Sequence, residues 1–148
     1  MPTHSDSKIL PYDAGQMFDL VADVAKYPEF LPWCAAARVR SVTPIEGGEE
    51  MLADLVISFQ VFRERFGSRV RLYRADGRIE TEYLDGPFRY LRSTWEFIPE
   101  GEGACEVRFF VDFEFRNFIL QKAIGLVFDQ AMRRIVRAFE ERAQALYG

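Results

Sequence analysis

The stretch that decides the fold is residues 107–128, VRFFVDFEFRNFILQKAIGLVF, because the spacing of its apolar residues changes in the middle. Up to Phe115 every second residue is apolar and most residues between are charged, as in an antiparallel strand with one buried face. From Phe118 to Tyr147 the apolar residues recur with helical spacing. A helix of about 30 residues is near 45 Å long, and only the concave side of a strongly twisted sheet gives it a place to lie.

The same alternation predicts further strands upstream. Apolar residues fall at alternate positions within Met51–Val61, Phe66–Leu72, Ile79–Tyr83 and Leu91–Phe97, with Ser68, Thr81 and Ser93 as polar exceptions. Asp, Gly and Pro residues supply the turns between these segments. Near the N-terminus, Thr3–Leu10 is also predicted to be a strand, which ends before a proline.

A short helix is predicted between the first strand and the others. Asp13 can cap it, Gln16 completes a capping box, and apolar residues recur at helical spacing over Ala14–Ala25. The order is strand, helix, six strands, long helix, which is an α+β fold with a curved antiparallel sheet wrapped around the C-terminal helix. No repeat or linker composition divides the chain, so residues 1–148 are expected to form a single domain.

The composition is ordinary for a soluble protein. With 148 residues, 49% of them hydrophobic, and a net charge of -4, the chain is not expected to bind DNA. Cys34 and Cys105 lack a CxxC partner, so reduced thiols are expected. The N-terminus lacks a secretory pattern and no apolar run is long enough to span a bilayer. The expected location is the cytoplasm, with any membrane contact peripheral and at the inner face.

Groups that could perform catalysis are scarce. His4 is the single histidine and lies near the start of the chain, which does not fit a histidine-based triad or metal site. Phosphate-binding glycine motifs are absent, and most carboxylates fall at outward strand positions or on the helix surface. We expect no catalytic residue, no metal and no cofactor, and therefore a protein that is not an enzyme.

Arginine is concentrated in one region of the predicted sheet. Of the 19 basic residues 16 are Arg, and eight of these lie between Arg63 and Arg92. Because guanidinium groups bind phosphate in a bidentate manner, this face could meet RNA or anionic lipid headgroups. The alternative, which the net negative charge favours, is cross-strand pairing with Glu80, Glu82 and Glu96.

The apolar faces are rich in bulky residues, since 15% of the chain is aromatic and 14 residues are Phe. Bulky walls on a curved sheet can enclose a pocket for an apolar ligand, with Thr81, Tyr83 and Ser93 as candidate polar anchors. A solid core is the alternative. The segment Tyr27–Cys34, YPEFLPWC, poses a similar choice, because it is either the rim of a pocket or a loop folded under the core.

Several motifs, in order along nearly the whole chain, resemble the coenzyme Q-binding START-like proteins, a family that includes the bacterial ribosome-association toxins. The motifs are Pro11-Tyr12, Phe18–Val24, Tyr27–Cys34, Asp85–Phe88 with Leu91 and Trp95, Asp112–Phe115, Ile124-Gly125 and Val127-Phe128. The resemblance implies a helix-grip fold with a hydrophobic tunnel between the curved sheet and the long helix.

The resemblance implies different functions for different branches. Members of the mitochondrial branch are linked to ubiquinone binding and respiratory electron transfer without catalysis, the toxin branch binds the large ribosomal subunit, and the wider superfamily includes polyketide cyclases. Our leading hypothesis is non-enzymatic binding of ubiquinone or a similar isoprenoid lipid in support of respiratory electron transport. Ribosome binding through the Arg63–Arg92 face is the alternative. The lack of a well-placed acid/base pair argues against a cyclase.

Under the leading hypothesis the ligand lies against nine apolar side chains, namely Phe59, Phe66, Leu91, Trp95, Phe97, Phe109, Phe113, Ile124 and Phe128. The mouth of the tunnel, which would also touch the membrane, is formed by Tyr27, Phe30, Leu31 and Trp33. Trp95→Ala is then expected to weaken ligand binding while leaving the fold intact.

Overall fold

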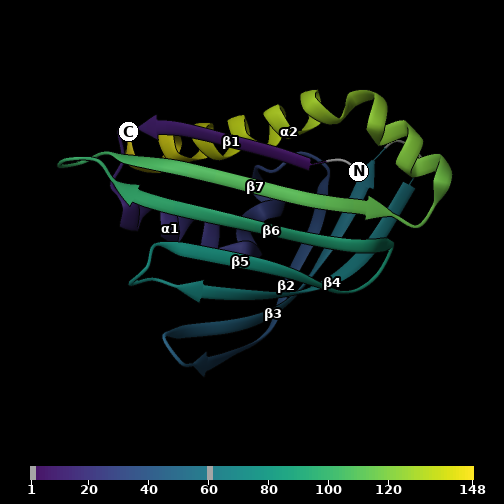
Figure 1. Ribbon diagram of the computed structural model, residues 1–148, viewed down its shortest axis with the longest axis horizontal. Helices are drawn as coiled ribbons and strands as arrows, with labels where there is room; N and C mark the ends of the chain where they lie inside the picture. Colours follow the sequence, from purple (N-terminus) through teal and green to yellow (C-terminus); the bar gives the residue numbers. More distant parts are fainter. Residues whose placement is uncertain (1–2, 60–61) are drawn as a thin grey trace.

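A computed structural model describes residues 3–59 and 62–148 of the chain (Figure 1). The elements follow the order strand, helix, six strands, helix, with a short 3₁₀ helix after the first α-helix. Their bounds are β1 Thr3–Leu10, α1 Ala14–Ala22, η1 Val24–Glu29, β2 Cys34–Ile45, β3 Gly48–Phe59, β4 Phe62–Tyr73, β5 Arg78–Asp85, β6 Phe88–Pro99, β7 Cys105–Phe115 and α2 Phe118–Tyr147. The predicted end of one strand at Val61 lies outside the described residues.

All seven strands form one antiparallel sheet in the order β1-β7-β6-β5-β4-β3-β2. The sheet twists so strongly that β2 to β4 cross the direction of β6 and β7 (Figure 1). The concave side holds α2, and Lys8 of β1 reaches Glu140 of α2 with an Nζ–Oε2 distance of 2.9 Å. The predicted α+β helix-grip architecture is therefore confirmed.

The edge strand β2 is irregular. Its pairing with β3 shifts register between Cys34 and Ala36 and again between Val39 and Ser41. Such bulges increase the local twist of a sheet and bend the strand that carries the extra residue. They therefore add to the curvature that lets the sheet wrap around α2.

The first helix begins as predicted and ends earlier. The Asp13 side chain accepts a hydrogen bond from the backbone N–H of Gln16, and the Gln16 side chain accepts one from the N–H of Asp13. The helix was expected to reach Ala25, but it ends at Ala22 and the chain continues as the 3₁₀ helix η1. Pro28 lies within η1, and since proline has no N–H an α-helix could not continue through it without losing a hydrogen bond.

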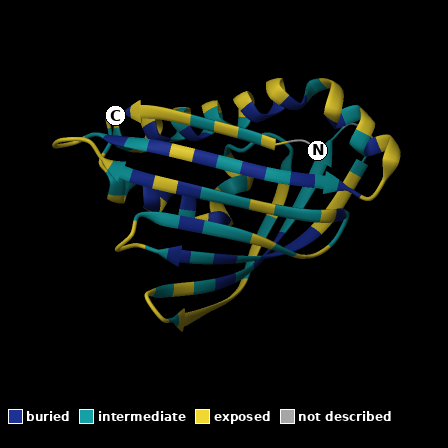
Figure 2. Ribbon diagram, viewed as in Figure 1, coloured by how far each residue is buried: buried dark blue, intermediate teal, exposed yellow. Residues whose placement is uncertain are grey.

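The long helix α2 has the predicted bounds. Asn117 caps it by accepting a hydrogen bond from the N–H of Leu120 at 3.0 Å. One stripe of the helix is buried against the sheet and α1, and it comprises Leu120, Ile124, Phe128, Ala131, Met132, Phe139 and Ala143. Burial alternates along β7 as expected for a strand with one covered face (Figure 2).

Most arginines on the outer face of the sheet are paired within the chain. Of the eight from Arg63 to Arg92, seven form an ion pair with a described acidic residue. Arg69 and Arg71 each contact both Glu50 and Glu82 at 3.3–3.8 Å. The predicted cross-strand pairing is confirmed for Arg69 and Arg71 with Glu82, whereas Glu80 pairs with Arg78 of its own strand.

Candidate functional site

An apolar cavity of about 210 Å³ lies between the concave face of the sheet and α2. The strands β3, β4, β6 and β7, the segment before β2 with the first residue of β2, and the part of α2 from Ile124 to Ile135 all contribute to it. The lining residues are Leu31, Pro32, Trp33, Cys34, Leu55, Ile57, Phe59, Phe66, Phe88, Leu91, Phe109, Val111, Phe113, Phe115, Ile124, Ala131, Met132 and Ile135. None of these side chains carries a charge, so the cavity favours an apolar occupant.

Six of the nine predicted ligand contacts line this cavity, namely Phe59, Phe66, Leu91, Phe109, Phe113 and Ile124. They come from five different elements, so the fold gathers residues that are far apart in the sequence. At the mouth, Leu31 and Trp33 also line the cavity. The part that each plays in binding a ligand stays a prediction.

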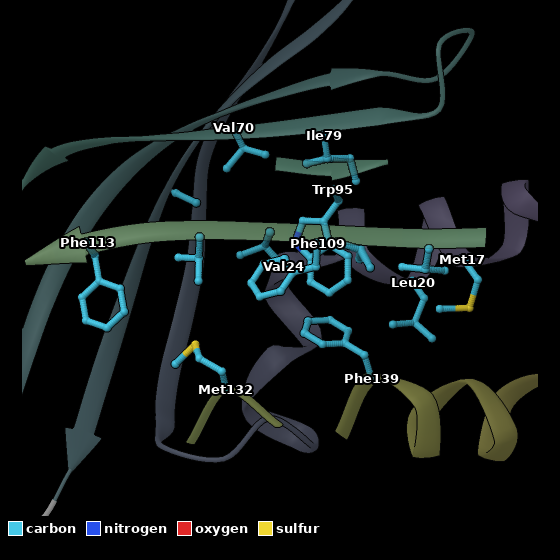
Figure 3. Close-up of a cluster of buried hydrophobic side chains, with 14 of the residues drawn as sticks. Met17, Leu20, Val24, Val70, Ile79, Trp95, Phe109, Phe113, Met132 and Phe139 are labelled. Carbon is cyan, nitrogen blue, oxygen red and sulfur yellow. The ribbon is translucent and has the colours of Figure 1, made fainter. Parts of the chain in front are cut away.

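The other three predicted contacts lie outside the lining. Trp95 packs against Phe109 and Phe139 with ring centroids 4.4 and 5.0 Å apart, and Figure 3 shows the three together in the core. Phe97 contacts Phe18 of α1. Phe128 lies beside Phe113 at 5.5 Å. The prediction that these three side chains form part of the cavity wall is therefore wrong. They are buried in the core beside the cavity.

Two of the four predicted mouth residues are half-buried and pack against the core. Tyr27 and Phe30 pack edge-on against Phe139, with ring centroids 5.5 and 5.3 Å from it. The Tyr27 hydroxyl donates a hydrogen bond to the carbonyl of Val21, and burial raises the pKa of this phenol far above its ordinary value. The segment Tyr27–Cys34 is thus divided, because the two aromatic rings of its first half pack against the core and its second half borders the cavity.

The polar anchors suggested by strand phase do not reach the cavity. Thr81, Tyr83 and Ser93 are absent from its lining. The Tyr83 hydroxyl instead accepts a hydrogen bond from the backbone N–H of Phe88 at 3.2 Å. Among the lining side chains, Trp33 carries an indole N–H and Cys34 a thiol, but the surface that the cavity presents is apolar.

The sequence analysis did not predict several of the lining residues as ligand contacts, although the alternation along the strands indicated that some of them face inward. Leu55 and Ile57 share the phase of Phe59, and Val111 and Phe115 share the phase of Phe113, so alternation alone would have placed them on the inner face. Phe88 follows a turn and gave no such signal. Its ring stacks on that of Phe115 with the two centroids 4.6 Å apart.

Trp33 has an unusual backbone at the cavity mouth. Its φ is +64°, and among the described residues other than glycine it alone has a positive φ. This conformation costs an L-residue about 1–2 kcal/mol. The indole packs edge-on to Phe59 at 5.7 Å, and the Arg134 guanidinium lies 5.2 Å from its ring centroid. Backbone strain that surrounding contacts hold in place is common at functional sites. The positive φ of Trp33 therefore supports a functional role for this residue.

The Cys34 thiol is kept neutral at the mouth. Burial raises its pKa to about 11, and the thiol donates a hydrogen bond from Sγ to the carbonyl of Ala36. The thiol is therefore protonated at neutral pH and behaves as a small apolar group in the wall.

The described residues do not include a cluster of three His, Cys, Asp or Glu side chains that could hold a metal ion. Within residues 3–59 and 62–148, neither helix combines the length and apolar character needed to cross a bilayer.

The model of one protein family, described as polyketide cyclase / dehydrase and lipid transport, matches residues 10–140. The chain belongs to this family. The predicted resemblance to START-like proteins is thereby confirmed, and the solved neighbours agree. A START superfamily protein from Mycobacterium smegmatis superposes with a TM-score of 0.80 at 18% identity, covering 97% of this chain and 98% of that chain. An aromatase/cyclase from Streptomyces has the same score at 14% identity, with 97% and 93% covered. At these identities the likeness concerns the fold alone.

Relatives in this family carry two kinds of name. A protein from Rickettsia prowazekii named ribosome association toxin RatA is 43% identical to this chain, and the aligned region covers 97% of each protein. A Xenopus laevis protein named coenzyme Q-binding protein COQ10 homolog B, mitochondrial, is 32% identical, with 98% of this chain and 59% of that protein covered. The family is thus shown, while its members have different named roles.

Proposed function

We propose that the chain binds the isoprenoid part of a quinone, or of a similar lipid, in the apolar cavity and does so without catalysis. The observation that carries the proposal is the cavity between the sheet and α2, whose lining has no charged side chain. The class of ligand follows from the relative named coenzyme Q-binding protein. An apolar wall stabilises an aliphatic chain by about 0.8 kcal/mol for each CH₂ group that it removes from water.

The size of the cavity supports a long, thin ligand. Its volume of about 210 Å³ lies below the roughly 300–1,000 Å³ that usually enclose a drug-sized molecule. A compact polycyclic substrate would need most of its surface inside the cavity. A chain molecule can instead insert one end and leave the remainder in the mouth beside Leu31 and Trp33.

The lining also lacks the groups that catalysis would need. General acid–base chemistry requires a carboxyl, imidazole, amine or similar group within hydrogen-bond reach of the substrate. Among the described lining residues the one ionisable side chain is Cys34, and its raised pKa keeps it protonated. These observations support a binding role more than a cyclase role.

A titration with ubiquinone analogues of increasing tail length tests the proposal, with tryptophan emission as the readout. We expect saturable quenching whose affinity rises with tail length. Ile57→Trp places a larger side chain in the cavity wall and should weaken binding at least about tenfold, because it fills space that the tail needs. Ile9→Trp is the matched control, since Ile9 is 60% exposed on β1 and outside the lining. Quenching that does not saturate, or equal affinity in both variants, would refute the cavity as the site.

Ribosome association is the second candidate, and the names of relatives such as the 43% identical toxin favour it. The proposed surface is the Arg63–Arg92 face, and binding to phosphates there should weaken as salt rises because counterions are released. Arg69→Glu with Arg71→Glu should abolish co-sedimentation with ribosomes and spare quinone binding.

The folding of this double variant needs a check, because both arginines already pair with Glu50 and Glu82. Arg63→Glu is the milder variant, since Arg63 is exposed and forms no ion pair with a described residue. Ribosome binding that survives both changes in folded protein would remove this surface from consideration.

A further inference from the structure

The outer face of the first half of α2 exposes large apolar side chains. Phe118, Ile119 and Leu126 are 78%, 69% and 82% exposed. Ile119 and Leu126 are seven residues apart and therefore lie on the same side of the helix. Single exposed apolar residues are ordinary, but three large ones within three turns form a patch of the kind that marks an interaction site.

Basic side chains surround this patch. The segment from Arg116 to Arg137 contains five basic residues and one acidic residue, Asp129, so it carries +4 in a chain whose net charge is -4. Lys122 lies between the apolar residues, and Arg133 and Arg137 are also exposed and follow Ile119 at helical spacing, so they continue the same side of the helix. None of these three forms an ion pair with another residue in the described part of the chain. The arginines of the sheet differ, because most of them are neutralised by a neighbouring carboxylate.

We propose that this face of α2, formed by Phe118, Ile119 and Leu126 with Lys122, Arg133 and Arg137, binds the surface of an anionic lipid bilayer. Exposed apolar residues enter the boundary between headgroups and acyl chains, while unpaired basic residues approach the lipid phosphates. A helix that carries both, with the apolar residues at one end and the basic residues along the same side, matches that interface.

The composition of the patch favours a bilayer over RNA. Basic residues would serve either partner, but proteins bind unpaired bases by stacking them on flat aromatic or guanidinium groups. Ile119 and Leu126 have no flat face, so an RNA surface would leave them without a partner. A bilayer accommodates their branched side chains directly.

The location of the patch differs from the membrane contact predicted from the sequence. Tyr27 and Phe30 of the predicted rim are packed against Phe139. The α2 face lies on the same helical turns as Ile124, which lines the cavity from the opposite side of the helix. Docking would therefore hold the cavity close to the bilayer. Binding of the α2 face to lipid does not require a ligand in the cavity.

Co-sedimentation of the full chain with quinone-free vesicles tests the surface. The vesicles contain phosphatidylcholine either alone or mixed with phosphatidylglycerol. We expect binding to the anionic vesicles that weakens as salt rises. Ile119→Ser with Leu126→Ser should weaken it about tenfold or more, because less apolar surface enters the interface. Lys122→Glu with Arg133→Glu should remove the preference for phosphatidylglycerol.

The matched control for the apolar variant is Val42→Ser with Leu146→Ser, since both residues are 52% exposed and lie outside the patch. This control should bind like the unmodified chain. The proposal is overturned if the unmodified chain does not bind anionic vesicles, or if the α2 variants and the control bind equally well. Binding to a single-stranded RNA homopolymer without binding to vesicles would also overturn it. Because no quinone is present, failure here leaves the cavity titration unaffected.

Discussion

At the scale of single residues, Trp95 illustrates how packing changes an expected role. Its side chain is buried, with Phe109, Phe139 and Phe97 around the indole. The sequence-based expectation that Trp95→Ala spares the fold therefore gives way to the expectation that this substitution destabilises it. Truncating a buried tryptophan removes apolar contacts and leaves a cavity.

We predict that Trp95→Ala lowers the free energy of unfolding by about 3–5 kcal/mol. Urea denaturation followed by far-ultraviolet circular dichroism measures the change. Trp33→Ala is the comparison, because Trp33 is half-buried at the cavity mouth and should cost much less stability. Similar losses in the two variants would contradict the assignment of Trp95 to the core and Trp33 to the mouth.

Cys34 gives a pH-dependent prediction. Burial raises its pKa in the folded protein to about 11, whereas an unfolded thiol titrates near pH 8.5. The folded state therefore holds the proton more tightly, so the stabilisation is complete below about pH 8.5 and is lost as the pH rises through 11. Alkylation of folded Cys34 by iodoacetamide should accelerate near pH 11 and that of the urea-unfolded chain near pH 8.5.

Mass spectrometry can follow this alkylation site by site. Cys105 is fully buried and serves as an internal control that should react when the chain unfolds. If Cys34 shows the same pH profile in the folded and unfolded chain, burial does not control its titration.

At the scale of elements, the alternation along each strand predicted which face is buried, but it could not predict what each residue would face. On β6, Leu91 lines the cavity, whereas Trp95 and Phe97 share its phase and pack in the core. Four residues along a strand span about 13 Å, which exceeds the width of a neighbouring helix. Periodicity reports the face of a strand, while the position of α1 and α2 decides where the cavity ends.

The irregular segment before β2 was harder to predict for a related reason. Proline and aromatic residues indicated that it is not a regular helix or strand, but sequence carries no signal for the direction of each ring. Tyr27 turns inward because its hydroxyl finds the carbonyl of Val21. Leu31 and Trp33 lie beyond η1 and reach the cavity instead.

Within α2, Gly125 gives a prediction of increased stability. It lies in the helix interior without a positive φ, and a Cβ added there would meet no atom within 4 Å. We expect Gly125→Ala to stabilise the fold by about 0.5–1 kcal/mol, because glycine loses more backbone entropy in a helix. The thermal unfolding midpoint should rise by a few degrees, measured by calorimetry.

Gly86→Ala is the matched control of opposite sign. Gly86 has φ +136°, and an added Cβ would lie 2.6 Å from the Cβ of Phe66. This substitution should lower the unfolding midpoint. A destabilising effect of Gly125→Ala would mean that the glycine meets a constraint other than helix propensity.

At the scale of the whole molecule, ligand binding and folding are linked if the cavity is the site. A ligand that binds the folded chain at about 100 times its Kd adds about 2.7 kcal/mol to stability. For a chain of this size we predict an increase of roughly 5–10 °C in the thermal unfolding midpoint with a long-tailed quinone analogue. Ile57→Trp should remove the increase, and Ile9→Trp should keep it. An unchanged midpoint in the unmodified chain at saturating analogue would contradict the linkage.

The register shifts of β2 also affect how the molecule behaves at high concentration. The strand occupies one edge of the sheet, and a long regular edge offers unpaired N–H and C=O groups to a second chain. Here two bulges interrupt the edge, Pro44 removes a donor from it, and Arg38 and Arg40 place charges along it. A strand from another copy would find no continuous ladder to extend along β2, so the same bends that curve the sheet around α2 protect this edge from edge-to-edge aggregation.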